Sequence, residues 1–210
     1  PMRALHFIHR FHRPENPDGR TMVLLHGTGG NETDLMPLAA RLAPGATLLG
    51  VRGRSTEEGI NRWFRRYDAT TYDQADIRAE AEAFAAFVAD ASRAYGLDPA
   101  RTTILGYSNG ANLLGAALQL YPDAMRPALL IRGIQVLEEP PELAPGALAG
   151  QRVLMLNGTR DPFSGMALAL EKALRQGGAD LDSQMVPAVH ELAAADLELA
   201  SAWLSAAPVA

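Results

Sequence analysis

The chain has 210 residues, a length that suits one α/β domain over residues 1–210. Lys and Arg number 19 against 24 Asp and Glu, and this acidic balance argues against a nucleic-acid-binding protein. Cysteine is absent, which excludes disulfide frameworks, thiolate metal sites and a cysteine nucleophile. A covalent enzyme of this composition would attack its substrate through serine, threonine or a carboxylate.

The sequence contains no membrane-spanning or secretion signal of the usual kind. No apolar run reaches the roughly 18 residues that a membrane-spanning helix requires. Residues 1–6 lack the apolar core of a secretion signal. We therefore expect a cytoplasmic protein without a membrane span.

Short apolar runs alternate with segments of helical periodicity, which predicts an α/β fold built on a mostly parallel sheet. Strands are expected over residues 5–11 at a sheet edge, 21–25, 46–51, 102–105, 128–136, 153–156 and 181–186. Helices are expected over residues 31–42, 75–95, 110–121, 165–176 and 192–205. Residues 31–33 should cap the first helix, and Asp73 and Gly96 should cap the second. A Rossmann-like nucleotide-binding fold shares this alternation, so motifs must separate the two.

The string Gly106-Tyr107-Ser108-Asn109-Gly110 lies between an expected strand and an expected helix, the context of the G-x-S-x-G nucleophile motif. Such a serine occupies a strained turn, where side chains two positions before and after it would strike the neighbouring strand and helix. Glycine at both positions removes that clash. The turn also places the hydroxyl at a helix N-terminus, where backbone N–H groups stabilise negative charge. We therefore expect Ser108 to be a nucleophile; a purely structural glycine turn is the alternative.

A serine hydroxyl needs a base, and His190 alone among the five histidines follows Ser108. In the fold that uses this motif, the acid and then the histidine come after the serine in the chain. Asp161 directly follows a strongly apolar strand, so it should reach the same sheet edge as Ser108 and orient His190. Glu138 is the reserve candidate for the acid. The alternatives are a surface-loop histidine and a turn-forming Asp-Pro pair.

The segment His26-Gly27-Thr28-Gly29-Gly30 leaves an expected strand and is rich in glycine, so its amides can approach a substrate closely. We assign the two N–H groups of an oxyanion hole to Thr28 and Asn109. A phosphate-binding loop is the alternative, but the G-x-G-x-x-G spacing and the Walker lysine are missing.

The other histidines are not expected to act in chemistry. His26 is interpreted as a structural residue that hydrogen-bonds the loop of residues 26–30, called the first loop below. Three more lie close together near the N-terminus, with a spacing that alternates between the faces of a strand. We interpret these three, His6, His9 and His12, as surface residues, and we expect no metal site.

These motifs together resemble the bacterial phospholipase/carboxylesterase family of α/β-hydrolases. The resemblance rests on the segments Leu24 to Glu32, Arg62 to Arg66, Gly106 to Asn112 and Gly158 to Pro162. It covers nearly the whole chain, with the motifs in the family's order. Val189 before His190 departs from the family's usual Gly-His pair. The chain is also similar to acyl-protein thioesterases and, more distantly, to dienelactone hydrolases, which use cysteine.

The resemblance implies an α/β-hydrolase fold with helices on both faces of the sheet and no large lid domain. It implies hydrolysis of short-chain or aryl carboxylic esters through the Ser108, His190 and Asp161 triad and an acyl-enzyme, without a metal or organic cofactor. A thioesterase or lysophospholipase with the same triad is one alternative, and a non-catalytic binding protein of this fold is another. The expected partner is a small-molecule ester, and apolar residues on the edge strand would permit a homodimer.

Residues 52–72 form the longest expected irregular segment and begin at the carboxyl end of a strand, so they can border the site. We expect Trp63 to contact the substrate as part of an aromatic wall, together with Gly29 and Phe163. A second hypothesis is that an arginine of this segment attracts a substrate carboxylate. The alternative is a solvated basic loop with one or two aromatic side chains held in the core.

Overall fold

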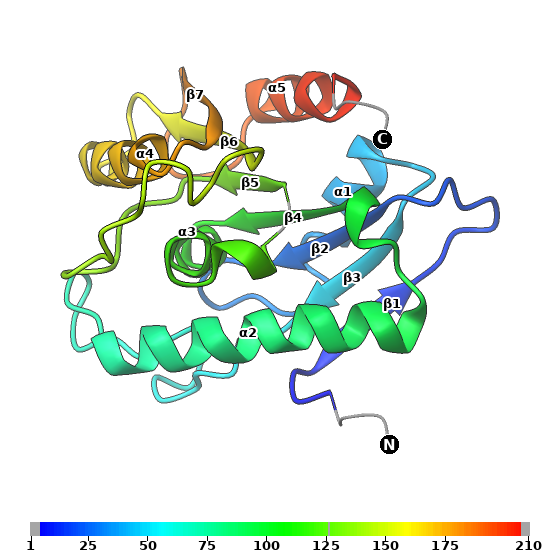
Figure 1. Cartoon of the computed structure of the whole chain (residues 1–210), viewed down its shortest axis with the longest axis horizontal. Coiled ribbons are helices and arrows are strands. Elements are labelled where there is room, and N and C mark those ends of the chain that lie inside the picture. The colour runs from blue at the N-terminus through cyan, green and yellow to red at the C-terminus, as the bar shows by residue number, and fades with distance from the viewer. Residues whose placement is uncertain (1–4, 126, 207–210) are drawn as a thin grey trace.

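A seven-stranded sheet, in the order β1-β3-β2-β4-β5-β6-β7, forms the framework of the computed structural model, which describes residues 5–125 and 127–206 (Figure 1). The strands are β1 (His9–His12), β2 (Thr21–Leu25), β3 (Thr47–Val51), β4 (Thr102–Tyr107), β5 (Ala128–Ile131), β6 (Arg152–Gly158) and β7 (Asp180–Val186). The helices are α1 (Met36–Leu42), α2 (Gln74–Tyr95), α3 (Asn109–Leu120), α4 (Ala167–Gln176) and α5 (Ala194–Ser205). Short 3₁₀ turns lie at Pro99–Arg101, Pro122–Ala124 and Ser164–Met166. Residues 1–4, part of the segment expected to lack a secretion signal, lie outside the described residues, as do 207–210 of the expected 1–210 domain.

The sheet is parallel except where β1 pairs with β3 at one edge. Strands β2 and β3 are buried along their whole length, because helices cover both faces of a parallel sheet. The mostly parallel sheet and the edge position of the first strand are therefore confirmed. The parallel direction brings the carboxyl ends of β2, β4, β5, β6 and β7 to one edge, where the loops that follow them meet.

Alternation along each strand divides the core into two layers. In β2, Val23 and Leu25 face the core beneath α2, α3 and α4, whereas Met22 and Leu24 face the core beneath α1 and α5. Figure 1 shows α2 along one side of the sheet and α5 along the other. Helices on both faces are thus confirmed.

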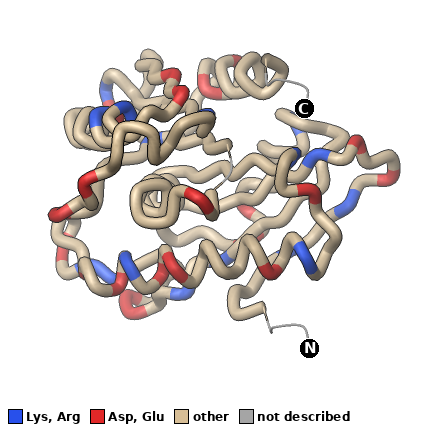
Figure 2. Tube along the Cα trace, viewed as in Figure 1, with Lys and Arg blue, Asp and Glu red and all other residues tan. Residues whose placement is uncertain are grey.

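Charged residues lie mainly on the outer helices and loops, as Figure 2 shows. Strands β2 to β5 contain no Lys, Arg, Asp or Glu, in keeping with their burial between two helical layers. Among the described helices, none has the length and apolarity needed to cross a membrane.

The long helix α2 begins and ends where the sequence predicts. The Asp73 carboxylate accepts a hydrogen bond from the Asp76 N–H at 3.0 Å, which satisfies one of the free donors at the helix start. Gly96 follows the helix with a φ of 64°, a left-handed conformation that glycine adopts without strain. The buried face of α2 includes Ile77 and Phe84, which belong to the core that α2, α3 and α4 form with the sheet.

Two predicted boundaries near the N-terminus are wrong. The first strand begins at His9 rather than Leu5, because Phe7 turns away from the sheet and is buried against aromatic residues of α2. The first helix begins at Met36, and the predicted cap does not cap it. The Asn31 side chain instead accepts the N–H two residues further on at 2.9 Å, which holds this stretch in a turn.

The fifth strand is also shorter than predicted. It ends at Ile131 instead of continuing to Val136, because Arg132 takes a φ of 59° and turns the chain out of the sheet. This conformation is uncommon for a residue with a side chain and usually depends on strong tertiary contacts.

The segment between β3 and α2 folds back onto the core. Two antiparallel bridges, Ser55 with Arg62 and Arg66 with Tyr72, give it a defined shape. Trp63 lies between them with no exposed surface. Within the described residues no helical insertion stands apart as a lid, so the loops at the carboxyl edge of the sheet stay close to the surface.

Candidate active site

Ser108 occupies the tight turn between β4 and α3. Its φ of 52° is unfavourable for a residue with a side chain, and such conformations cost about 1–3 kcal/mol. The residue directly precedes α3, so the unpaired N–H groups of the first helical turn lie beside it. The strain and the helix start together favour a reactive hydroxyl at this position.

The two glycines of the motif have the steric role that the sequence predicts. A Cβ on Gly106 would lie 2.7 Å from the Ala111 nitrogen at the start of α3. A Cβ on Gly110 would lie 2.2 Å from the carbonyl oxygen of Leu25, at the end of β2. Side chains at these positions would therefore push the helix and the strand apart.

Three side chains that are far apart in the sequence form one hydrogen-bonded chain at this turn. Ser108 Oγ lies 2.7 Å from His190 Nε2, and Asp161 Oδ2 lies 2.8 Å from His190 Nδ1. Because a carboxylate only accepts, Nδ1 carries the proton and Nε2 is free to accept from the serine hydroxyl. The structure thus brings together the residues predicted as nucleophile, base and acid.

The loops that carry Asp161 and His190 are in close contact. A Cβ on Gly158, the last residue of β6, would lie 2.4 Å from the carbonyl oxygen of Ala188. Asp161 is 4% exposed, and its second carboxylate oxygen accepts from the Phe163 N–H at 2.9 Å. The carboxylate is therefore fixed in position and aimed at the imidazole. The reserve acid, Glu138, is exposed and donates its backbone N–H to Gln74 on α2.

The loop around His190 is held by Tyr107, the last residue of β4, and by Arg132, the residue after β5. Tyr107 donates its hydroxyl to the His190 carbonyl at 3.1 Å, and burial raises the pKa of this tyrosine, which keeps the hydroxyl protonated. Arg132 donates Nε to the carbonyl of Val189 at 2.9 Å and Nη2 to the carbonyl of Glu191 at 3.1 Å. The guanidinium therefore binds the carbonyls of the residues directly before and after the histidine.

Arg132 is itself held by a buried ion pair. Its Nη1 and Nη2 donate to the two carboxylate oxygens of Asp196 on α5, at 2.8 and 2.9 Å. The two side chains are 0% and 1% exposed. The pair explains the left-handed backbone at Arg132, since that conformation aims the side chain beneath the histidine loop.

Breaking this pair from one side should destabilise the protein. The variant Asp196→Leu is expected to lose about 3–5 kcal/mol of unfolding free energy, because it leaves a buried guanidinium without its counter-charge. The double variant Arg132→Met, Asp196→Leu should recover much of the loss. Urea denaturation of the wild type, the single variant and the double variant measures the three unfolding free energies. Glu80→Leu, which breaks the more exposed pair with Arg54, is the control and should change stability by about 1 kcal/mol or less. A comparable loss of stability in Glu80→Leu would contradict the view that burial of the Arg132–Asp196 pair causes the loss in Asp196→Leu.

The first loop is braced by the segment that follows β3. The Gly29 N–H donates to the Asn61 carbonyl at 2.8 Å, and the Asn61 amide donates to the Gly30 carbonyl at 2.8 Å. Arg62 Nη1 donates to Thr28 Oγ1 at 2.8 Å. These contacts leave the backbone N–H of Thr28 without a partner among the described residues, as an oxyanion donor would need.

The turn that carries Ser108, called the serine elbow below, is held by the same segment. The buried side chain of Asn109 accepts the Trp63 backbone N–H at 2.7 Å, and the Trp63 indole donates to the His26 carbonyl at 2.8 Å. Asn109 is the first residue of α3, so its own N–H has no partner within the helix. Thr28 and Asn109, the two residues predicted to supply an oxyanion hole, therefore both line the pocket at Ser108.

His26 is buried beneath the first loop. Its Nε2 accepts the Gly53 N–H at 2.9 Å, so its Nδ1 carries the proton and donates to the Gly27 carbonyl at 2.6 Å. Both ring nitrogens are thus used by the backbone, and the ring lies 5.2 Å from that of Trp63. Burial lowers the pKa of His26 below its ordinary value.

This pKa shift predicts a pH dependence of stability. The unfolded chain takes up the proton near the ordinary histidine pKa of 6.5, whereas the folded protein resists protonation of His26. The stability contributed by neutral His26 is therefore fully present above about pH 6.5 and falls as the pH decreases below it. The unfolding free energy of His26→Gln, measured from about pH 8 to about pH 5, should decline less steeply than that of the wild type. His6→Gln, at an exposed position, should keep the wild-type slope, and a slope unchanged in His26→Gln would contradict the prediction.

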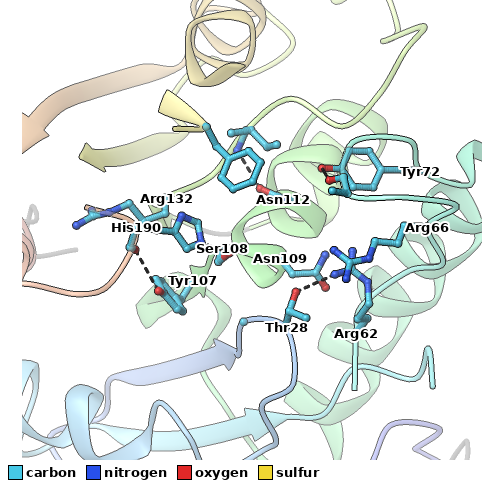
Figure 3. A pocket seen from close by; sticks show the side chains of 14 residues that line it. Thr28, Arg62, Arg66, Tyr72, Tyr107, Ser108, Asn109, Asn112, Arg132 and His190 are labelled. Carbon is cyan, nitrogen blue, oxygen red and sulfur yellow. Dashed lines mark hydrogen bonds between the residues drawn. The ribbon is translucent and has the colours of Figure 1, made fainter. Parts of the chain in front are cut away.

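A pocket of about 270 Å³ opens beside Ser108 (Figure 3). Its polar wall contains hydroxyl, amide, imidazole and guanidinium groups, and its apolar wall consists of small, aromatic and branched side chains. The lining residues are Gly27, Thr28, Arg62, Arg66, Ala69, Tyr72, Tyr107, Ser108, Asn109, Asn112, Arg132, Ile134, Phe163 and His190. The volume lies just below the usual range of ligand pockets, which is about 300 to 1,000 Å³.

Of the three residues predicted to contact a substrate, one lines the pocket and two do not. Phe163 lines the pocket, and its ring meets that of His190 edge-on at 5.7 Å. Trp63 does not line it, so its prediction as an aromatic wall is wrong: the indole is fully buried and holds the first loop from behind. Gly29 is also not among the lining residues, because the chain reverses there and its N–H points to Asn61.

The structural role of Arg132 and the presence of Asn112 and Ile134 in the pocket are not predicted from the sequence. Asn112 accepts the Ile134 N–H at 2.9 Å, so α3 and the chain after β5 close one side of the pocket together. The available signal was Arg132 itself, an isolated charge inside an apolar run. Such a residue at the end of a parallel strand indicates a buried partner or a site.

The three N-terminal histidines are not all surface residues. His6 and His12 are exposed, but His9 is half-buried because β1 faces α2 on one side. Its Nδ1 donates to the Phe7 carbonyl at 2.8 Å, and its Nε2 accepts from the Tyr95 hydroxyl at 2.6 Å. Among the described residues, no group of three or more His, Cys, Asp or Glu side chains is arranged to hold a metal ion.

The sheet order and the serine turn define an α/β-hydrolase, and comparisons with known proteins agree. No family model matches the chain. The "Putative hydrolase MhqD" of Bacillus subtilis (strain 168) is 33% identical over 196 residues, which cover 90% of this chain and 94% of that protein. The crystal structure of a carboxylesterase from Mesorhizobium loti has a TM-score of 0.90 at 39% identity, covering 96% of this chain and 95% of the other. The Bacillus cereus carboxylesterase has a TM-score of 0.88 at 31% identity, covering 95% and 94%.

The chain belongs to the phospholipase/carboxylesterase family of α/β-hydrolases and is a carboxylesterase-type hydrolase. The family resemblance, the fold class and the enzyme class predicted from the sequence are confirmed.

Proposed function

We propose that the protein hydrolyses short-chain or aryl carboxylic esters through an acyl-enzyme on Ser108. The observation that carries the proposal is the hydrogen-bonded chain from Ser108 through His190 to Asp161, at a serine with a strained backbone. The esterase names of the relatives support the same reaction class. The small pocket favours small acyl and alcohol groups.

The reaction begins when Ser108 Oγ bonds to the ester carbonyl carbon and passes its proton to His190 Nε2. Asp161 keeps the proton of Nδ1 in place and stabilises the imidazolium that forms. The N–H groups of Thr28 and Asn109 stabilise the charge on the carbonyl oxygen. The bond to the alcohol oxygen then breaks, and His190 protonates the departing alcohol. Water repeats the sequence on the acyl-enzyme, releasing the acid and free Ser108.

Two measurements on the wild-type protein test this proposal. Turnover of 4-nitrophenyl esters from acetate to octanoate should show the highest kcat/KM for the short acyl chains. A fluorophosphonate should inactivate the protein in a one-to-one ratio, with the added mass on the peptide that contains Ser108. Turnover without labelling at Ser108 would assign the nucleophile to another residue. Absence of both turnover and labelling would favour a non-catalytic binding protein.

The ester and thioester alternatives need a separate comparison. Ethyl acetate and ethyl thioacetate differ only in the atom that leaves. A higher kcat/KM for the oxygen ester is the expected result, and a large preference for the thioester would favour the thioesterase alternative.

A further inference from the structure

Two arginine side chains border the pocket on the side away from the imidazole. Arg62 and Arg66 both line the pocket, and Figure 3 shows them across Ser108 from His190. No Asp or Glu is among the described residues that line it. The third lining arginine, Arg132, is already neutralised by the buried carboxylate of α5. Positive charge is therefore concentrated at one end of the pocket.

Each of these arginines has one terminal nitrogen without a hydrogen-bond partner among the described residues. Arg62 donates Nη1 to Thr28 Oγ1 at 2.8 Å and Nε to the Phe64 carbonyl at 3.4 Å, and its Nη2 has no partner among the described residues. Arg66 donates Nε and Nη2 to Glu58, at 3.1 to 3.2 Å, and within the described chain its Nη1 is likewise unpaired. A carboxylate offers two oxygens, which suits two such donors.

The charge of the pair is incompletely balanced. One carboxylate, that of Glu58, serves both arginines, at 3.5 Å from Arg62 Nε and 3.1 Å from Arg66 Nε. The Arg62 side chain is 4% exposed, so water compensates its charge poorly. Burial and then the charge of Arg66 lower the pKa of Arg62. A bound anion would relieve this repulsion and would replace the missing counter-charge.

The position of the pair relative to His190 decides which part of an ester it meets. The alcohol must leave on the His190 side of Ser108, because His190 donates its proton. The acyl group then extends from the carbonyl toward the opposite side. Arg62 lies there, hydrogen-bonded to Thr28 of the first loop.

We propose that Arg62 and Arg66 bind a carboxylate at the far end of the acyl group, so that the preferred substrates are half-esters of short dicarboxylic acids. The inference rests on the proposed ester hydrolysis at Ser108 and narrows its substrate class. Arg66 is a specificity-determining residue in this scheme, since its side chain carries no hydrogen bond to the first loop or the elbow. Arg62 has two functions, because it also positions Thr28.

The test compares two esters that differ only at the end of the acyl chain. Monoethyl glutarate ends in a carboxylate where ethyl pentanoate ends in a methyl group. The wild type should hydrolyse the half-ester with a kcat/KM ~10-fold or more above that of the neutral ester. Arg66→Gln should lower this preference ~10-fold or more, and Arg62→Gln should lower it while slowing both esters. Arg65→Gln, an exposed position between them that does not line the pocket, is the matched control and should keep the wild-type preference.

A binding measurement separates failure of the subsite from failure of the hydrolytic function. Calorimetric titration with glutarate should show binding to the wild type and to Arg65→Gln, and much weaker binding to Arg66→Gln. A wild type that prefers ethyl pentanoate, or equal preferences in Arg66→Gln and Arg65→Gln, would overturn the subsite and leave ester hydrolysis standing. Glutarate binding that depends on Arg66, in a protein that cleaves neither ester, would support the subsite and count against the proposed function. A preference for an ester with the carboxylate on its alcohol part, such as 3-acetoxypropanoate, would overturn the acyl-side assignment.

Discussion

Replacing Ser108 by alanine is expected to lower kcat for 4-nitrophenyl acetate by about 10⁵- to 10⁶-fold, the loss seen when the nucleophile of a serine triad is removed. The reason is that the acyl group has no oxygen to bond to, and His190 has no proton to take from it. The small alanine should leave the fold intact, because Ser108 donates its hydroxyl only to His190. Steady-state turnover and the unfolding midpoint of the same preparation check both statements.

Ser92→Ala is the matched control for this prediction. Ser92 lies on α2 and donates its hydroxyl to the Val88 carbonyl within the helix, away from the pocket. Its removal should leave kcat within about twofold of the wild type, since it breaks one local hydrogen bond. Equal rates for the wild type and Ser108→Ala would remove Ser108 from the mechanism.

The variant Asp161→Asn is expected to lower kcat by about 10⁴-fold. An amide has the shape of the carboxylate, but its NH₂ group can only donate, so it favours the imidazole tautomer with the proton on Nε2. That proton would face Ser108 Oγ, and His190 could no longer accept from the serine. The Phe163 N–H can still bond to the amide oxygen, which should preserve the loop.

Glu138→Gln tests the competing assignment of the acid. Glu138 is exposed in the chain segment that follows β5, and it contacts α2 through its backbone N–H. Its removal should leave kcat unchanged. A loss of ~10³-fold or more in Glu138→Gln, with near-normal turnover in Asp161→Asn, would reverse the two roles.

The hydrogen-bonded chain of Ser108, Asp161 and His190 was predictable because simple rules converge on it. Parallel strands end at a common sheet edge, so the loops that follow β4, β6 and β7 meet there, although Ser108 and His190 are 82 positions apart in the sequence. The glycine spacing around the serine is a local steric requirement, and it can be read without knowing the rest of the fold.

The errors arise where a side chain is placed by tertiary contacts. Trp63 lies in an irregular segment, and nothing in its neighbours shows that the indole will donate to the His26 carbonyl under the first loop. Arg132 interrupts an apolar run that reads as a continuous strand. Its left-handed backbone depends on Asp196, which lies 64 residues further along the chain. The late start of β1, at His9 rather than Leu5, likewise depends on contacts of Phe7 with aromatic residues of α2 that the local pattern does not reveal.

The arginines of the segment after β3 also divide according to tertiary contacts. Arg52 and Arg54 pair with Glu32 and Glu80, away from the pocket, whereas Arg62 and Arg66 face it. All four belong to one irregular segment, over which the sequence shows no helical or strand periodicity. Their separate functions follow from the two short antiparallel bridges, which curl the segment so that only its second half reaches the pocket.

The hydrogen bonds from buried Arg132 to the backbone beside His190 also affect when the site can form during protein synthesis. The ribosome releases the serine elbow first, whereas Asp196, which holds Arg132, belongs to the last described helix. A nascent chain that already has its elbow therefore still lacks a positioned base. On the mechanism proposed for Ser108, we expect hydrolytic activity only after α5 has docked and Asp196 has paired with Arg132.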